Sequence, residues 1–192
     1  MFQKNSLLGK ILRDYCLDVC GIHGIGHWFR VIDYGYMLGK QNKANLKIVT
    51  LFGLLHDSRR ADDRYDRHHG SRAATYSQML YEDGWLDLTS AEMDILCQAC
   101  AGHTEGLGHT DNTIRTCWDA DRLDLHRFGW EIDPDLLSTE EAREFISREK
   151  PPFIEPSFEL GGDLLDNLIE TRKEDSLIST YFWGSGTLKR DT

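Results

Sequence analysis

Apolar residues recur at helical spacing through most of the chain, and no alternation of apolar and polar residues is long enough to indicate a sheet. The pattern therefore predicts an all-α fold. The helix expected over 46–55 is apolar on nearly all sides, so it should lie at the centre of the core. We expect the other helices over 5–20, 26–40, 69–83, 90–103, 112–128 and 160–173, with one more beginning behind residues 138–141.

Capping signals and prolines punctuate this pattern. Thr89-Ser90-Ala91-Glu92 and Ser138-Thr139-Glu140-Glu141 both have the form of a capping box, which marks the start of a helix. Pro151 and Pro152 separate the final helix from the preceding ones. The last dozen residues are expected to be a tail. In the second helix, one face is predicted to carry the apolar residues Trp28, Val31, Ile32, Tyr36 and Met37.

Length and charge bound the class of protein. The 192 residues suit one domain spanning 1–192, with a motif-bearing core at about 20–130 and a C-terminal helical extension at about 131–180. The formal net charge is -10, from 22 Lys+Arg against 32 Asp+Glu. Since such a field repels phosphate, we expect no long nucleic acid and no membrane among the partners.

The N-terminal segment and the cysteines indicate a cytoplasmic protein. Arg13, Asp14 and Asp18 interrupt the first apolar stretch, which excludes a signal peptide or a spanning segment there. Five cysteines, an odd number, are typical of reduced thiols. Cys97-x-x-Cys100 has no second pair to accompany it, so these two are predicted to be buried small residues. A structural zinc protein built on them is one alternative.

The informative chemistry begins at His56-Asp57, where the central apolar helix ends. A carboxylate at that position needs a cation or several donors, because an unpaired buried charge is very costly. A divalent metal ion meets this need, with further ligands from His27 and from Asp119 or Asp121. Such a mixed imidazole and carboxylate set suits Mn, Fe, Ni, Co or Zn and disfavours Mg.

The motifs follow one another in the order H…HD…D, with His27 placed 29 residues before His56 and Asp121 placed 64 residues after Asp57. In this order and spacing the chain resembles the HD-domain metal-dependent phosphohydrolase superfamily. The resemblance implies an HD-domain helical bundle with a five-helix core and additional C-terminal helices. It also implies that His27, His56, Asp57 and Asp121 bind one divalent metal ion. Asp121 is favoured because Arg122 follows it directly, and Asp119 is the alternative.

The same resemblance implies roles for residues around the metal. Asp57 would be the catalytic residue, holding the metal and accepting or orienting the proton of a water molecule. Arg60, three residues after Asp57, matches a position where many HD proteins carry a Lys or Arg, and it is the first choice for a phosphate contact. His69 and His103 would contact substrate, protonate the leaving oxygen or bind a second metal ion. We favour one ion, with both histidines lining the pocket beside Arg122, the fourth candidate substrate contact.

These features favour a hydrolase that cleaves a phosphate ester or anhydride of a small molecule, with a nucleotide as the preferred substrate. The alternative is a regulatory or ligand-binding HD module with little or no turnover. A homo-oligomer remains open. Four aromatic residues could stack a base, although their spacing is more typical of core positions: Trp28, Phe29, Tyr65 and Trp118. The remaining histidines are assigned to the surface or the core: His23, His68, His109 and His126.

Overall fold

The computed structural model describes residues 6–147, and every regular element in that range is helical. This confirms the predicted all-α class, since no strand occurs among these residues. The helix expected over 160–173 and the expected tail lie outside the described residues. The elements are α1 (Leu7–Asp14), α2 (Ile25–Asn42), α3 (Leu46–Leu55), α4 (His69–Glu82), α5 (Ser90–Gly102), α6 (Asn112–Leu123), the 3-10 helices η1 (Asp124–Phe128) and η2 (Pro134–Leu136), and α7 (Glu140–Ile146).

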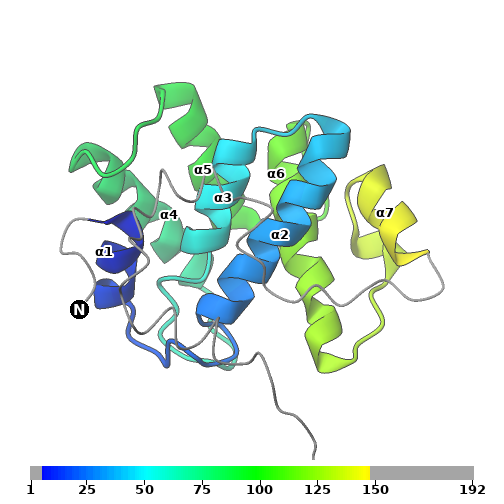
Figure 1. Ribbon diagram of the computed structural model, residues 1–192, viewed down its shortest axis with the longest axis horizontal. Coiled ribbons are helices and arrows are strands. Elements are labelled where there is room, and N and C mark those ends of the chain that lie inside the picture. Colours follow the sequence, from blue (N-terminus) through cyan, green and yellow to red (C-terminus); the bar gives the residue numbers. More distant parts are fainter. Residues whose placement is uncertain (1–5, 148–192) are drawn as a thin grey trace, which may run out of the picture.

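The helices pack around α2 and α3, as Figure 1 shows. The most extensive contacts are between α4 and α5, between α2 and α3, and between α2 and α6. α3 also contacts α1, α5 and α6, whereas α7 packs on α2 and α6 at the edge of the bundle. The apolar run from Ile48 to Leu55 is buried throughout, so α3 is the central helix that its sequence predicts.

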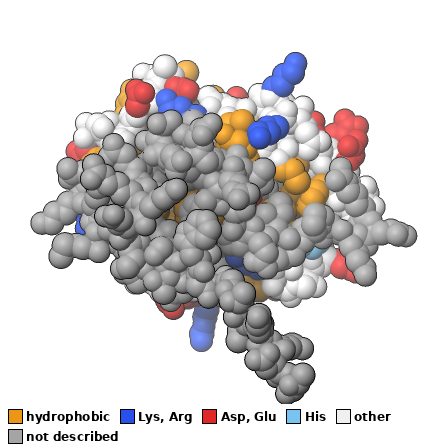
Figure 2. All heavy atoms as spheres, in the orientation of Figure 1, with side chains coloured by type: hydrophobic (Ala, Val, Ile, Leu, Met, Phe, Trp, Pro, Cys, Tyr) orange, Lys and Arg blue, Asp and Glu red, His pale blue; other side chains and the backbone are white. Residues whose placement is uncertain are grey.

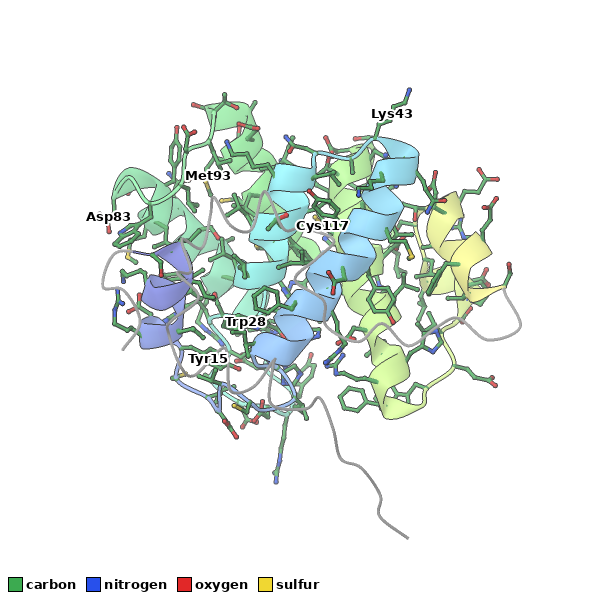
Figure 3. All side chains as sticks on the ribbon, viewed as in Figure 1. Tyr15, Trp28, Lys43, Asp83, Met93 and Cys117 are labelled. Atoms are coloured by element: carbon green, nitrogen blue, oxygen red, sulfur yellow. The ribbon has the colours of Figure 1, made fainter. Side chains whose placement is uncertain are left out.

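The buried surface of α2 is wider than the predicted stripe, because α3 and α6 cover two sides of this helix. Trp28 is fully buried and contacts the ring of Tyr15 edge to face, with centroids 5.1 Å apart (Figure 3). Tyr34 and Leu38 are buried as well, whereas Tyr36 and Met37 are only half-buried. The predicted apolar face is therefore buried at its N-terminal end and only half-buried at its C-terminal end, where Met37 still packs against the core.

Two glycines allow α2 and α3 to approach closely. A Cβ atom at Gly53 would lie 2.4 Å from Ile32 Cγ1 and 3.1 Å from the carbonyl oxygen of Trp28. A Cβ atom at Gly35 would lie 2.4 Å from Val49 Cγ1. Since real side chains do not come this near, both positions need glycine. The close contact brings the start of α2 to the end of α3.

The helix caps agree with the sequence signals at α5 and differ at α7. Thr89 and Glu92 form the predicted capping box of α5. At α7 the N-cap is Thr139, whose hydroxyl accepts a hydrogen bond from the Ala142 amide, so the box proposed to begin at Ser138 does not form. A tertiary contact explains this difference, because the amides of both Ser138 and Thr139 donate hydrogen bonds to the Asp119 carboxylate on α6.

Two predicted helices end early. α1 ends at Asp14, since Tyr15 is extended, and residues 15–24 form turns in which the Asp18 side chain accepts from the Cys20 amide. The helix expected over 112–128 ends at Leu123 and continues as the 3-10 helix η1, which closes at the left-handed Gly129. Both changes matter for the site, because they set the positions of His23 and Asp124.

The surface carries charges of both signs. Acidic and basic side chains are interspersed over the coloured part of the face in Figure 2. None of the helices within residues 6–147 combines the length and the apolar character needed to cross a membrane.

Candidate metal centre

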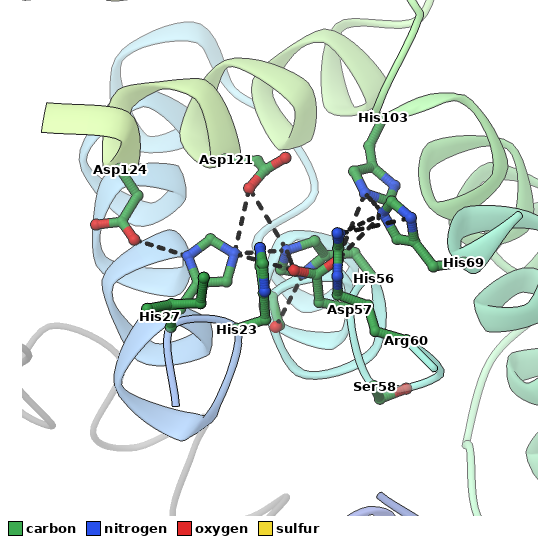
Figure 4. A network of polar contacts seen from close by, with 12 residues as sticks. His23, His27, His56, Asp57, Ser58, Arg60, His69, His103, Asp121 and Asp124 are labelled. Carbon is green, nitrogen blue, oxygen red and sulfur yellow. Dashed lines mark hydrogen bonds and ion pairs between the residues drawn. The ribbon is translucent and has the colours of Figure 1, made fainter. Parts of the chain in front are cut away.

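Four of the predicted site residues converge from three segments of the chain. His27 comes from the first turn of α2, His56 and Asp57 from the end of α3, and Asp121 from the last turn of α6. The Nε2 atom of His27 lies 3.1 Å from His56 Nε2, 3.3 Å from Asp121 Oδ1 and 3.5 Å from Asp57 Oδ2. His56 Nε2 lies 3.5 Å from Asp121 Oδ1 and 3.9 Å from Asp57 Oδ2. We call these four residues the first cluster (Figure 4).

Three donor atoms of the first cluster, from His27, His56 and Asp57, are geometrically able to hold a divalent ion, and Asp121 Oδ1 lies 3.3 Å from His27 Nε2. Ligands bound about 2.1 Å from one ion lie roughly 3.0–3.4 Å apart, close to the separations found here. The Nδ1 atom of His27 donates to Asp124 Oδ2 at 2.7 Å, and that of His56 donates to the carbonyl oxygens of Phe52 and Gly53. In its neutral form, each imidazole therefore presents an Nε2 lone pair to the same space, as metal-binding histidines do.

A second cluster shares Asp57 with the first. Asp57 Oδ1 lies 3.2 Å from His69 Nε2 and 3.7 Å from His103 Nε2, and these two nitrogens are 2.7 Å apart. The Nδ1 atoms of His69 and His103 donate to main-chain carbonyls, those of Asp66 and Cys100. Both groups, His27 with His56 and Asp57, and Asp57 with His69 and His103, are geometrically able to hold a metal ion. The two carboxylate oxygens of Asp57 thus face different clusters.

Arg60 lies against the second cluster. Its Nη1 atom is 3.1 Å from His69 Nε2 and 3.3 Å from Asp57 Oδ1. The guanidinium is buried, with 8% of the residue exposed, and its other nitrogens donate to the carbonyl oxygens of Asp62 and Arg64. The structure therefore places this predicted substrate contact beside the candidate metal ligands.

The charged state of the first cluster follows from its hydrogen bonds. Burial alone would lower the pKa of His27, but Asp121, Asp124 and Asp57 accept hydrogen bonds from it and raise its pKa to about 10. Burial would raise the pKa of Asp57 and of Asp121, but the neighbouring histidines hold both values well below their usual range. Both carboxylates are therefore anionic at neutral pH and require positive charge nearby.

Comparison with known proteins identifies the fold. No protein-family model matches the chain, and no curated protein matches it significantly. Among solved structures, the chain is similar to the 1.45 Å crystal structure of a predicted HD superfamily hydrolase from an uncultured Thermotogales bacterium. The TM-score is 0.57 and the identity 26%, over 73% of this chain and 81% of that chain. The protein has an HD-domain fold. The similarity supports a hydrolase as the general kind of protein.

Asp124 supports the HD site from behind, a role that the sequence analysis missed. This buried carboxylate accepts from His27 Nδ1 and also from the guanidinium groups of Arg30 and Arg127. It lies three residues after Asp121, so the two share a helix face. That spacing was the available signal, but a contact across 97 residues to His27 is not visible in the sequence.

Asp119, the alternative ligand, faces away from the histidines of the HD site. Its carboxylate accepts hydrogen bonds from the amides of Ser138 and Thr139 and from the Thr139 hydroxyl, at 2.7–3.1 Å. Arg122 Nη1 lies 3.7 Å from Asp119 Oδ1. Asp119 therefore links α6 to the start of α7 by hydrogen bonds, whereas the Asp121 side chain lies in the first cluster.

A cavity of about 490 Å³ opens over both clusters of the HD domain. This volume is typical of small-molecule sites. The four predicted substrate contacts Arg60, His69, His103 and Arg122 all line it. The cavity is also lined by residues that were not among the predicted site residues: the basic residues His23 and Arg127, the acidic Glu131 and Asp133, the polar Thr104, and the apolar Leu107, Leu125, Trp130, Ile132 and Leu136.

The aromatic residues suggested for base stacking lie elsewhere in the HD fold. Trp28, Phe29 and Trp118 are buried in the core, and Tyr65 is 80% exposed outside the cavity lining. Trp130, which is 60% exposed, is instead the aromatic residue of the cavity wall within the described chain. Cys97 and Cys100 also behave as packing residues, because the former is half-buried and the latter fully buried.

Proposed function

We propose that the protein is a metal-dependent phosphohydrolase that cleaves a phosphate ester or anhydride of a small molecule, with a nucleotide as the favoured substrate. The observation that carries the proposal is the convergence of His27, His56, Asp57 and Asp121 on one space, with separations of 3.1–3.9 Å, beneath a cavity lined by arginines. The likeness to a predicted HD superfamily hydrolase supports it.

The first cluster would hold one divalent ion, with Mn, Fe, Ni, Co or Zn as candidates. The second cluster offers Asp57 Oδ1, His69 and His103 for a second ion. An ion bound in the first cluster supplies hydrolytic chemistry by acidifying a water molecule and by polarising a phosphoryl oxygen. Asp124 positions His27 for this binding, since its carboxylate fixes the Nδ1 tautomer.

The residues of the cavity then have separate tasks. Asp57 accepts or orients the proton of the attacking water, because its two oxygens face both clusters. Arg60 and Arg122 donate hydrogen bonds to the non-bridging phosphoryl oxygens, where negative charge accumulates in the transition state. His69 or His103 protonates the leaving oxygen when its ring carries a second proton and is not bound to metal.

Cavity size and charge support a small substrate. A nucleotide fits within about 490 Å³, and Trp130 offers an exposed ring for its base. Arg60, Arg122 and Arg127 line the cavity and, together with a bound ion, would offset its four carboxylates, those of Asp57, Asp121, Glu131 and Asp133. A long polyanion would meet the acidic remainder of the surface.

The test uses purified full-length protein loaded in turn with Mn²⁺, Co²⁺ and Ni²⁺ and assayed against a panel of nucleotides and generic phosphoesters. We expect metal-dependent release of phosphate or of a phosphorylated product. Asp57→Asn should reduce turnover by about a thousandfold or more. Asp87→Asn, the same change at an exposed aspartate, should not.

Two results would contradict the enzyme proposal. One is the absence of metal-dependent turnover across the panel, which, if nucleotides still bind tightly, favours the regulatory HD module. The other is turnover that Asp57→Asn leaves unchanged.

A further inference from the structure

The guanidinium of Arg60 lies where a cation of the second cluster would lie. Arg60 Nη1 is 3.1 Å from His69 Nε2 and 3.3 Å from Asp57 Oδ1, and these two atoms are themselves 3.2 Å apart (Figure 4). One donor nitrogen thus contacts two of the three candidate metal ligands. The third, His103 Nε2, lies 2.7 Å from His69 Nε2.

His69 has one lone pair for these partners. Because its Nδ1 atom donates to the carbonyl oxygen of Asp66, the only ring atom that can offer a lone pair is Nε2. That lone pair binds either an N–H group of Arg60 or a metal ion. A second ion bound through His69 therefore requires Arg60 to withdraw from this nitrogen.

The main chain holds Arg60 in this place. Its Nη2 atom donates to the carbonyl oxygen of Arg64 at 2.9 Å, and its Nε atom donates to that of Asp62 at 3.3 Å. Only 8% of the residue is exposed, so the guanidinium is shielded from water. In such a low-dielectric environment it repels another cation strongly. It brings positive charge to Asp57, whose anionic carboxylate needs it.

The first cluster is arranged differently. The nearby arginines, Arg30 and Arg127, bind Asp124 on the far side of His27. Their hydrogen bonds neutralise the supporting carboxylate on the Nδ1 side of His27. The first cluster is therefore open to a metal ion at its Nε2 side, whereas Arg60 contacts the second.

We propose that Arg60 and a second divalent ion are alternative occupants of the second cluster, so that Arg60 limits the protein to one tightly bound ion. The inference rests on the metal centre of the proposed function, and it adds that one residue determines how many ions the centre holds. It concerns ion binding in the absence of substrate, and so does its test.

The experiment titrates metal-free, full-length protein with Mn²⁺, counting bound ions by equilibrium dialysis and elemental analysis and free Mn²⁺ by its electron paramagnetic resonance signal. Wild type should bind one ion tightly. Arg60→Gln should bind a second ion with an affinity at least about tenfold higher than that of wild type. Arg60→Lys, which keeps the charge but loses the planar fork, should give an intermediate affinity.

Two controls locate the effect. Arg64→Gln removes the same charge from an exposed position of the same loop and keeps the carbonyl that Arg60 uses, so it should resemble wild type. Arg60→Gln combined with His103→Ala should lose the second ion, because a ligand of the second cluster is gone. The first ion should remain in every variant, which reports that the centre is folded.

Equal second-ion affinity in wild type and Arg60→Gln would overturn the inference. So would a second ion that persists after His103→Ala, since it would then lie outside the cluster. Binding of no ion by any of these proteins would instead refute the proposed metal centre. Failure to hydrolyse phosphoesters, with the ion counts as expected, would refute the proposed activity alone.

Discussion

The Nε2 atoms of His27 and His56 lie 3.1 Å apart, and the Nδ1 atom of each ring donates to an acceptor behind it. Two lone pairs that face each other at this distance repel unless a proton or a metal ion lies between them. Carboxylate partners raise the pKa of His27 to about 10, so in the metal-free protein the proton resides on His27.

The stability of the metal-free protein should therefore fall with rising pH. A raised His27 pKa means that the folded state binds more protons than the unfolded state between pH 6.5 and about 10. The stabilisation is complete below the lower value and is lost as the pH passes the upper one. Thermal unfolding in a chelator should show a falling Tm across this window, and His27→Gln should flatten the profile. A Tm that rises from pH 7 to 9 in metal-free wild type would contradict the assignment.

Asp124→Asn should weaken metal binding in the first cluster by about 10- to 100-fold, because the amide no longer fixes the His27 tautomer as a carboxylate does. The same substitution leaves Arg30 and Arg127 without their shared anion, so the free energy of unfolding should also fall. Calorimetric titration with Mn²⁺ measures the first effect and urea unfolding the second. Asp87→Asn is the matched surface control, and equal Mn²⁺ affinities in the two variants would argue against this role.

Asp119 and Asp121, two residues apart, should respond oppositely to the same change. Asp119→Asn should lower the free energy of unfolding by about 1–3 kcal/mol, because it weakens the hydrogen bonds to Ser138 and Thr139, and should leave the metal affinity within about twofold. Asp121→Asn should abolish tight metal binding and preserve the fold. If Asp119→Asn lost the metal ion and Asp121→Asn kept it, Asp119 would be the ligand and Asp121 would not.

Glycines should control the two clusters separately. Gly53→Ala pushes α3 away from Ile32 on α2, so we expect a loss of about 1–3 kcal/mol and weaker binding at the first cluster. Gly70→Ala places a Cβ atom 2.5 Å from the Cys100 carbonyl oxygen and 3.2 Å from the His103 ring, so it should separate His69 from His103. Metal counting and urea unfolding test both variants. Gly108→Ala, where a Cβ atom meets no neighbour within 4 Å, is the control.

Trp130→Ala should raise the KM for a nucleotide by about tenfold and leave kcat within about twofold, because loss of ring stacking weakens binding without touching the reacting phosphate. The measurement is steady-state kinetics on a nucleotide identified in the panel assay. Tyr65→Ala, at an exposed ring outside the cavity lining, should behave as wild type. An unchanged KM would show that the base lies elsewhere.

The sequence predicted those parts of the site whose signal is local. The apolar run of α3 located His56 and Asp57 at a helix end, and the order of the motifs added His27 and Asp121. Asp124 and His23 were missed for a different reason. Each joins the site through the packing of η1 or of turns at the ends of α2 and α6, which helical periodicity does not specify. The N-cap of α7 was misplaced in the same way, because Asp119 fixes it from another helix.

The acceptors behind the imidazoles have a consequence for how this centre can change. Main-chain carbonyls orient His56, His69 and His103, so no side-chain substitution removes these acceptors directly. Only His27 depends on a side chain, that of Asp124. Position 124 is therefore where a single codon change could adjust the basicity of a ligand and leave the backbone intact, and it offers the natural starting point for retuning the metal preference.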